Sequence, residues 1–292
     1  MTMIEHMKYL EPFMHIYMCE LEMYLKSHSE ELLEISFQSD EANTDRPLKE
    51  YLKKTIEQKC NHIEAFSNVS TVSFTTCCYE IDDNIRNIRI QQVLLPEELT
   101  DDIKTNLKPR KKGVFTNPDL CLVLNIEDTI VYQTIELKST KSDSIPGSSV
   151  QQISPFEWVI FIQHNARNID VTTGQYMNAV NTKMQFPDRS PRPQVSFNEL
   201  KNWNQQNRII NPNDIYFDSS ENKDKQRLLE DWQGVLAERW KDILFTFDIS
   251  KKEPWFNNNL RKFILEFLAV YDEFDDVKKE EYKALIASLI KK

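Results

Sequence analysis

The chain has 292 residues with a formal net charge of −10, and 40% of its residues are hydrophobic. This length is enough for one large domain or two small ones with a real core, and the 28% of charged residues and only four glycines exclude a fibrous or low-complexity chain. No apolar run is long enough to span a membrane and none of the five cysteines forms a Cys-x-x-Cys pair, so we expect a soluble cytoplasmic protein without a disulfide framework or a zinc site.

The first part of the chain contains two expected helices followed by two expected strands. Apolar residues recur every three or four positions over residues 3–37 and again over 48–66, which predicts two amphipathic helices separated by a polar break. The β-branched residues over 69–81 predict a strand, and residues 85–95 suggest another. Residues 99–113 are polar and are expected to be a connector.

Residues 119–138 predict a β-hairpin with its tip at Glu127 and Asp128, because two aliphatic runs flank this polar pair. A tip at these residues places Asp119 directly opposite Glu136. Opposed residues of an antiparallel pair have Cβ atoms about 4.5–5.5 Å apart, which suits two carboxylates that share one divalent ion. Lys138 points to the same face as Glu136, since strand side chains alternate. A slip of one residue in the register would break this arrangement.

The second half of the chain begins with a short helix expected at about 148–153 and a buried strand expected over 157–163. An amphipathic helix is predicted over 172–183, and the proline-rich residues 186–195 are expected to form a stiff segment. After residue 212 the pattern is mainly helical, with amphipathic helices predicted over 223–247, 260–274 and 277–290.

The hairpin residues Pro118-Asp119 and Glu136-Leu137-Lys138 resemble the signature of the PD-(D/E)XK nuclease superfamily, and the residues that follow resemble those of type II restriction endonucleases. The expected order over 48–163, helix, strand, strand, strand, helix, strand, is also that of the superfamily's core. The resemblance implies an α/β (α+β) fold with a restriction-endonuclease-like core, in which helices flank a central mixed β-sheet and further helices are added at both ends.

The resemblance divides the chain into three expected parts. These are an N-terminal helical extension at 1–47, a nuclease core with a DNA-contacting insertion at 48–212, and a C-terminal helical region at 213–292 that belongs to the same domain or forms a dimerisation subdomain.

The resemblance also implies a chemistry, namely Mg²⁺-dependent, sequence-specific hydrolysis of double-stranded DNA. Asp119 and Glu136 would bind the Mg²⁺ together with the backbone carbonyl of Leu137, since this ion prefers oxygen ligands. Lys138 would orient the attacking water or stabilise the phosphorane. Whether Lys138 acts as a base stays open, because an amine beside Mg²⁺ needs a lowered pKa to do so.

A second copy of the same loose pattern, Pro187-Asp188 followed by Glu199-Leu200-Lys201, serves as an internal control. Ser196 and Glu199 form a capping box, which predicts the start of a helix. Glu199 and Lys201 would then lie about 200° apart around that helix. We therefore expect only the first copy to form a site.

The distribution of charge favours contact with DNA at the centre of the chain. Residues 104–212 carry 13 basic and 9 acidic side chains, whereas both flanking parts are net acidic. Phosphate affinity depends on local charge, so this pattern predicts a basic cleft in an acidic body, although chance segregation of surface charge would look the same. The expected DNA contacts, to phosphates or to base edges, are Arg110, Lys111, Lys112, Lys141, Gln175, Asn178, Lys183, Arg189, Arg192 and Gln194.

Three further residues are accessory candidates at the same site. Glu64, or alternatively Glu57, would add an acid from the helix before the first core strand, although a solvated helix face explains either one as well. Gln151 and Gln152 would reach phosphate or water from the helix that follows the hairpin, or else lie on its surface.

A homodimer on duplex DNA is expected from the resemblance and from the symmetry of short duplex targets, with the C-terminal helices as the interface. Two alternatives stay open at this point. One is another PD-(D/E)XK nuclease that acts in repair or recombination. The other is a non-catalytic helical interaction protein in which the two acids and the lysine form a surface ion cluster.

Overall fold

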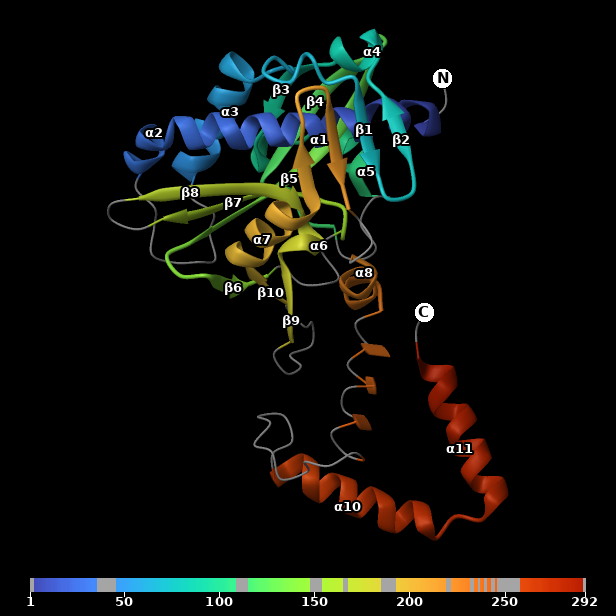
Figure 1. The fold of residues 1–292 in the computed structure, drawn as a ribbon. Helices are drawn as coiled ribbons and strands as arrows, with labels where there is room; N and C mark the ends of the chain where they lie inside the picture. Colours follow the sequence, from blue (N-terminus) through green and yellow to red (C-terminus); the bar gives the residue numbers. More distant parts are fainter. Residues whose placement is uncertain are drawn as a thin grey trace. The chain divides into compact units, whose positions relative to one another are not determined.

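The computed structural model describes residues 3–35, 46–108, 115–147, 154–164, 168–184 and 193–218, and beyond them residues 222–231, 234–235, 237–238, 241–242, 245 and 258–290. The chain divides into two compact units. One unit contains helices α1 to α8 and all the described strands, and the other contains helices α10 and α11 (Figure 1). Each unit is described separately below.

A five-stranded sheet with the strand order β3-β4-β5-β7-β8 lies at the centre of the first unit. Strands β5 and β7 run parallel, and the other neighbouring pairs are antiparallel, so the sheet is mixed. Its strands are β3 (Arg89–Leu94), β4 (Leu120–Ile126), β5 (Thr129–Thr140), β7 (Trp158–His164) and β8 (Ile169–Gln175). Because helices flank this sheet, the predicted mixed α/β class is confirmed.

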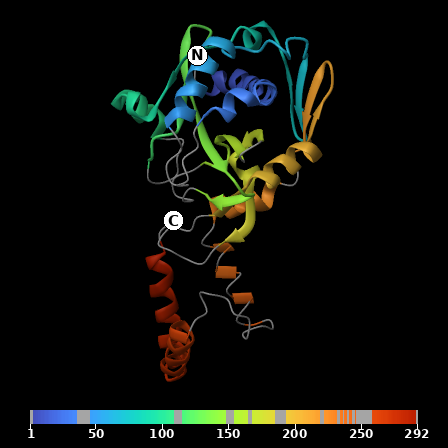
Figure 2. The ribbon, with the colours of Figure 1, turned by 90° about the vertical axis from the view of Figure 1, so that its left-hand side faces the viewer.

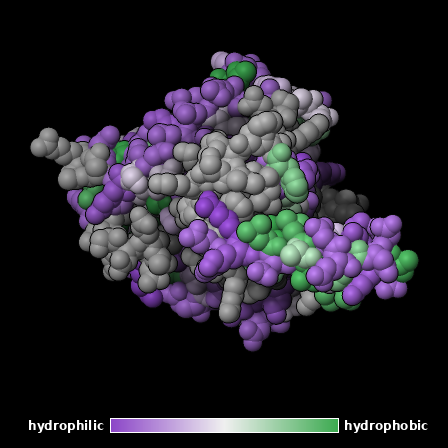
Figure 3. Space-filling view, turned by 90° about the horizontal axis from the view of Figure 1, so that it is seen from below, coloured by the Kyte–Doolittle hydropathy of each residue, from purple (hydrophilic) through white to green (hydrophobic). Residues whose placement is uncertain are grey.

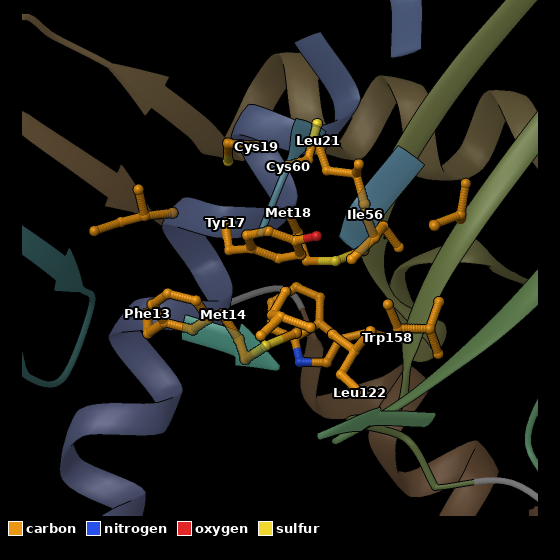
Figure 4. Packing of buried hydrophobic residues seen from close by; sticks show 14 of the residues in the cluster. Phe13, Met14, Tyr17, Met18, Cys19, Leu21, Ile56, Cys60, Leu122 and Trp158 are labelled. Atoms are coloured by element: carbon orange, nitrogen blue, oxygen red, sulfur yellow. The ribbon is translucent and has the colours of Figure 1, made fainter. Parts of the chain in front are cut away.

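One face of the sheet is covered by the long helix α1 (Met3–Ser27), which Figure 2 shows nearly end-on. Nearly all the side chains of α1 from Tyr9 to Glu22 are buried, so the helix is enclosed on all sides here. Phe13, Tyr17 and Leu21 share one core with Leu122 and Trp158 of the sheet (Figure 4). The expected N-terminal extension therefore belongs to the same hydrophobic core as the sheet.

The opposite face of the sheet carries two smaller clusters. Val159 and Phe161 of β7 pack against the short helix α6 (Tyr176–Ala179) and against α7 (Phe197–Asn207). Cys121 of β4 packs against α5 (Asp101–Leu107). The sheet is thus the middle layer of three.

Two smaller sheets and several helices complete the unit. Strand β1 (Thr71–Phe74) pairs with β2 (Cys78–Glu80) and, in parallel, with β12 (Asp214–Phe217), which also pairs with β11 (Arg208–Ile210). Strand β10 (Pro193–Ser196) pairs with β6 (Ser144–Pro146) and β9 (Val180–Met184). The remaining helical elements are α2 (Ser29–Leu33), α3 (Arg46–Lys59), α4 (Asp83–Arg86), the 3₁₀ turn η1 (Pro96–Glu98) and α8 (Asn222–Glu230).

The structure corrects several expected elements near the site. Helix α3 ends at Lys59 instead of continuing to residue 66, and the strand expected over 69–81 is the hairpin β1–β2. The expected connector 99–113 contains α5, because the Thr100 side chain accepts a hydrogen bond from Ile103 N (3.4 Å) and caps this helix. The short helix expected at 148–153 lies outside the described residues.

The second unit consists of α10 (Asn258–Asp272) and α11 (Asp276–Leu289), and neither helix has a buried residue. Phe267 of α10 contacts Tyr282 of α11, with ring centroids 6.4 Å apart. Large hydrophobic side chains are exposed on both helices, among them Phe263, Leu265 and Leu285. Patches of hydrophobic surface are also visible in the space-filling view (Figure 3).

The buried His15 makes the stability of the first unit dependent on pH. Its ring lies 4.6 Å from Phe217 and 4.8 Å from Trp158, measured between centroids, and burial together with the charge of Arg208 lowers the pKa of His15 from 6.5 to about 3. The unfolded chain therefore binds a proton between these values and the folded protein does not. The effect of His15 on the free energy of unfolding is absent above pH 6.5. As the pH drops from 6.5 toward 3, protonation of His15 in the unfolded chain lowers the free energy of unfolding by up to about 1.4 kcal/mol per pH unit.

The variant His15→Phe is expected to lose this part of the pH dependence, because phenylalanine does not titrate. Urea denaturation between pH 7 and pH 4 measures it, and the half-buried His28→Gln serves as the control. An unchanged pH profile in His15→Phe would show that other groups cause the acid sensitivity.

Candidate active site at the β4–β5 hairpin

The β4–β5 hairpin turns at Glu127 and Asp128, as expected. Both residues have positive φ angles, 47° and 63°, as a two-residue type I′ turn requires. The observed register pairs Leu120 with Ile135 and continues residue by residue to the tip. The predicted register is therefore confirmed over the paired residues, and Asp119 lies one residue before the first of these pairs.

The carboxylate of Asp119 lies just before β4 and is engaged on both oxygens. Its Oδ2 accepts a hydrogen bond from the backbone N of Leu137 (2.8 Å), and its Oδ1 lies 2.7 Å from Nζ of Lys49. Lys49 comes from the first turn of α3. The side chains of Asp119 and Lys49 are only 15% and 16% exposed, so this ion pair is largely shielded from solvent.

The carboxylate of Glu136 forms a second ion pair on the same strand. Its Oε1 lies 2.7 Å from Nζ of Lys138, and both side chains are 13% exposed. Their strand neighbours on β7 are Val159 and Phe161, which face the α6–α7 side of the sheet. Glu136 and Lys138 therefore share that face, as the alternation of strand side chains predicts.

The ionisation of the site is set by how close these charges lie. Burial lowers the pKa of Lys138, but the negative charge of Glu136 and the proximity of Tyr176 outweigh this and hold the pKa above its ordinary value. Burial and the charge of Glu136 raise the pKa of Asp119, and Lys49 offsets only part of this. A cation bound near both carboxylates would reduce this repulsion and favour their ionised forms.

The residues present fit a Mg²⁺ ion that keeps most of its waters. Asp119 and Glu136 supply carboxylate oxygens as ligands. The backbone N–H of Leu137 donates a hydrogen bond to Asp119, and the carbonyl of Leu137 points to the same side of the strand as this N–H. Among the described residues there is no cluster of three or more His, Cys, Asp and Glu side chains suited to a metal. Mg²⁺ is commonly held by one or two carboxylates and several waters, so the pair is sufficient.

In the described part of the second copy, Glu199 and Lys201 do not pair with each other, and Pro187 and Asp188 lie outside the described residues. Ser196 caps α7 by accepting a hydrogen bond from the backbone N of Glu199 (3.1 Å), as predicted. The Glu199 carboxylate pairs with Lys225 (3.0 Å), whereas Lys201 pairs with Asp170 (2.7 Å). The helix thus separates the acid from the lysine, which confirms the rejection of this copy.

The prediction of a helix over 172–183 is wrong. Most of this segment belongs to β8 and β9, with the single turn α6 between them. Asn178 is 2% exposed, so its side chain does not lie on the polar surface that was expected to meet DNA. Gln175 is half-buried at the end of β8. The reason for the error is physical, because β-branched residues such as Thr172 and Thr173 suit a buried strand as well as a helix.

The other expected DNA contacts are dispersed or not described. Lys141 is exposed just after β5, and Gln194 of β10 is half-buried, with Oε1 3.5 Å from Nδ2 of Asn181. Lys183 lies on β9, and only its backbone is described. The remaining candidates lie outside the described residues; they are Arg110, Lys111, Lys112, Gln151, Gln152, Arg189 and Arg192. Their roles stay predictions.

Of the two accessory acids, only Glu57 lies on the expected helix. Glu64 follows the end of α3 and is exposed, and its backbone N donates to Glu20 (2.8 Å). Glu57 is on α3, but its Oε1 accepts a hydrogen bond from Val93 N (2.8 Å) and so supports strand β3. The residue that α3 does bring to the site is Lys49, which no local pattern indicated.

The chain was compared with protein-family models, with curated proteins and with solved structures. No protein-family model, no curated protein and no solved structure matches the chain. Among the residues that the structure describes, no helix is both long and apolar enough to cross a membrane. The case for a function therefore depends on the hairpin and its charged residues.

Proposed function

We propose that the protein is a Mg²⁺-dependent endonuclease of the restriction type that cleaves double-stranded DNA at a short specific sequence. The observation that carries this proposal is the pairing register of β4 and β5, which brings Asp119, Glu136 and Lys138 together with Leu137. A sheet of mixed strand direction with α3 beside it also agrees with a restriction-endonuclease-like core.

Each residue then has a definite task. Asp119 and Glu136 would hold the Mg²⁺, with the Leu137 carbonyl as a third protein donor. When bound, Mg²⁺ activates a water and neutralises the charge that develops on the phosphate. Lys138 would donate a hydrogen bond to the attacking water or to the phosphate oxygens. Burial opposes its charge, but Glu136 holds the pKa of Lys138 above its ordinary value, which favours a role as a cation over a role as a base.

The partners of this activity follow from charge and exposed surface. The basic middle of the chain, residues 104–212, would contact the DNA phosphates. The exposed hydrophobic side chains of α10 and α11 would bind a second copy of the chain, giving a homodimer for a symmetric target. Sedimentation should then show a dimer, and truncation before α10 should give a monomer.

The competing proposal is a non-catalytic interaction protein. Its supporting observation is that both carboxylates already have lysine partners at 2.7 Å, as they would in a structural ion cluster. Against this, burial of such a cluster is costly compared with apolar residues, and burial and the charge of Glu136 raise the pKa of Asp119.

Incubation of the purified protein with unmethylated DNA of varied sequence in Mg²⁺ separates the possibilities. Discrete fragments support a restriction enzyme, whereas a smear or structure-dependent nicking supports another nuclease of the superfamily. Absence of cleavage on diverse DNA would refute the enzymatic proposal. DNA affinity should also fall steeply as salt rises, because phosphate contacts release counterions.

A further inference from the structure

Lys49 has a position that the proposed chemistry does not explain. Its ammonium lies 2.7 Å from Oδ1 of Asp119. Lys49 would therefore compete with a divalent ion for this carboxylate. The apolar side of α3, with Leu48, Leu52 and Ile56 fully buried, anchors the helix in the core. The backbone of Lys49 is therefore fixed, and only its flexible side chain can move away from Asp119.

The charges at the site explain why such a cation is present. Without it, the two largely shielded carboxylates would lose one of the two lysine ion pairs at the site. A divalent ion brings two positive charges to the same carboxylates, so Lys49 and Lys138 together match its charge. The pair of lysines and the divalent ion are thus alternative ways to neutralise Asp119 and Glu136.

We propose that Lys49 is an internal counter-ion that makes metal binding depend on DNA binding. Without DNA, Lys49 occupies Asp119 and opposes the divalent ion. A phosphate of bound DNA gives the ammonium a second anionic partner, so Lys49 releases Asp119 and the ion binds more tightly. By thermodynamic reciprocity, the ion must then strengthen DNA binding by the same factor. This inference rests on the proposed function and adds a regulation to it.

Helix α3 supplies a matched control. Lys53, one turn after Lys49, is similarly shielded at 21% exposure and forms an ion pair of 2.6 Å with Glu98. Glu98 accepts a hydrogen bond from Leu95 N (2.7 Å) at η1 and is no part of the carboxylate pair. Lys53→Met therefore removes a similar ion pair from the same helix without touching Asp119.

The test is a calorimetric titration of the metal-free protein with Mn²⁺, in the absence of DNA. In Lys49→Met the dissociation constant for Mn²⁺ should fall by about tenfold, a typical coupling between sites. Lys49→Arg, which keeps the charge, and Lys53→Met should both bind Mn²⁺ as the wild type does. Circular dichroism confirms that each variant is folded.

A second readout measures the coupling itself. The affinity of duplex DNA is compared in EDTA and in Ca²⁺, which takes the same oxygen ligands; the wild type should show a clear gain with Ca²⁺, and Lys49→Met a smaller one. If the wild type binds Mn²⁺ through Asp119 but Lys49→Met binds it no more tightly, the counter-ion proposal is wrong while the nuclease proposal stands. If Asp119→Asn binds Mn²⁺ as well as the wild type, both proposals fail.

Discussion

Replacement of Glu22 by leucine should lower the free energy of unfolding by about 3–5 kcal/mol, the usual result of removing one partner of a buried ion pair. Glu22 of α1 is buried, with its Oε1 2.9 Å from Arg208 Nη2 and its Oε2 3.1 Å from Arg208 Nη1. Its Oε2 also accepts a hydrogen bond from Thr173 N of β8 (2.8 Å). Burial would raise the pKa of Glu22, but Arg208 and Lys26 hold it below its ordinary value.

Two variants show whether this loss has the stated cause. In the double variant Glu22→Leu/Arg208→Met, part of the stability should return, because no guanidinium is then left without its ionic partner. Lys26→Ala should cost only about 0–1 kcal/mol, since Lys26 is 41% exposed. Urea denaturation provides the values. A loss in Glu22→Leu no larger than that in Lys26→Ala would refute this account.

Replacement of Lys138 by methionine should reduce the cleavage rate by about 10²–10³-fold, as removal of one hydrogen-bond donor from a transition state does. The methionine side chain has a similar length and suits the partly buried position, so the fold should persist. DNA affinity should change little, because the loss concerns the transition state. Single-turnover cleavage at saturating DNA, with circular dichroism as the check on folding, measures this.

The pH dependence distinguishes the roles open to Lys138. Burial opposes its charge, but Glu136 holds the pKa of Lys138 above its ordinary value, which favours the charged form. Lys138→Arg should therefore keep more activity than Lys138→Met, and the wild-type rate should show no titration of this lysine between pH 7 and pH 9. A rate that rises over this range in the wild type alone would identify Lys138 as a base.

The part of the site that could be predicted is local in the sequence. The turn residues Glu127 and Asp128 are adjacent and lie between aliphatic runs, so they determine the register of β4 and β5. The helical second copy of the pattern was equally accessible, because Ser196 caps α7 only three residues from Glu199.

What could not be predicted depends on contacts between distant parts of the chain. Lys49 precedes Asp119 by seventy residues, and its contact with Asp119 follows from how α3 packs beside the sheet, which no periodicity shows. Asn178 is polar in the sequence but is enclosed by the core that α6 and α7 form. Helix α5 is different, since its cap at Thr100 was visible in the sequence and was overlooked.

The central claim is that Asp119 and Glu136 serve one divalent ion on which DNA cleavage depends. The isosteric variant Asp119→Asn should remain folded, because the raised pKa of Asp119 means that its ionised form costs stability as the pH rises toward neutrality. Glu199→Gln, from the second copy of the pattern, is the matched control.

The most direct measurement is the rate of duplex DNA cleavage as Mg²⁺ is added to the metal-free protein. The account predicts cleavage that appears with Mg²⁺ in the wild type and in Glu199→Gln, and no cleavage at any Mg²⁺ concentration in Asp119→Asn. Equal cleavage by Asp119→Asn, or cleavage by the wild type that persists in EDTA, would contradict it.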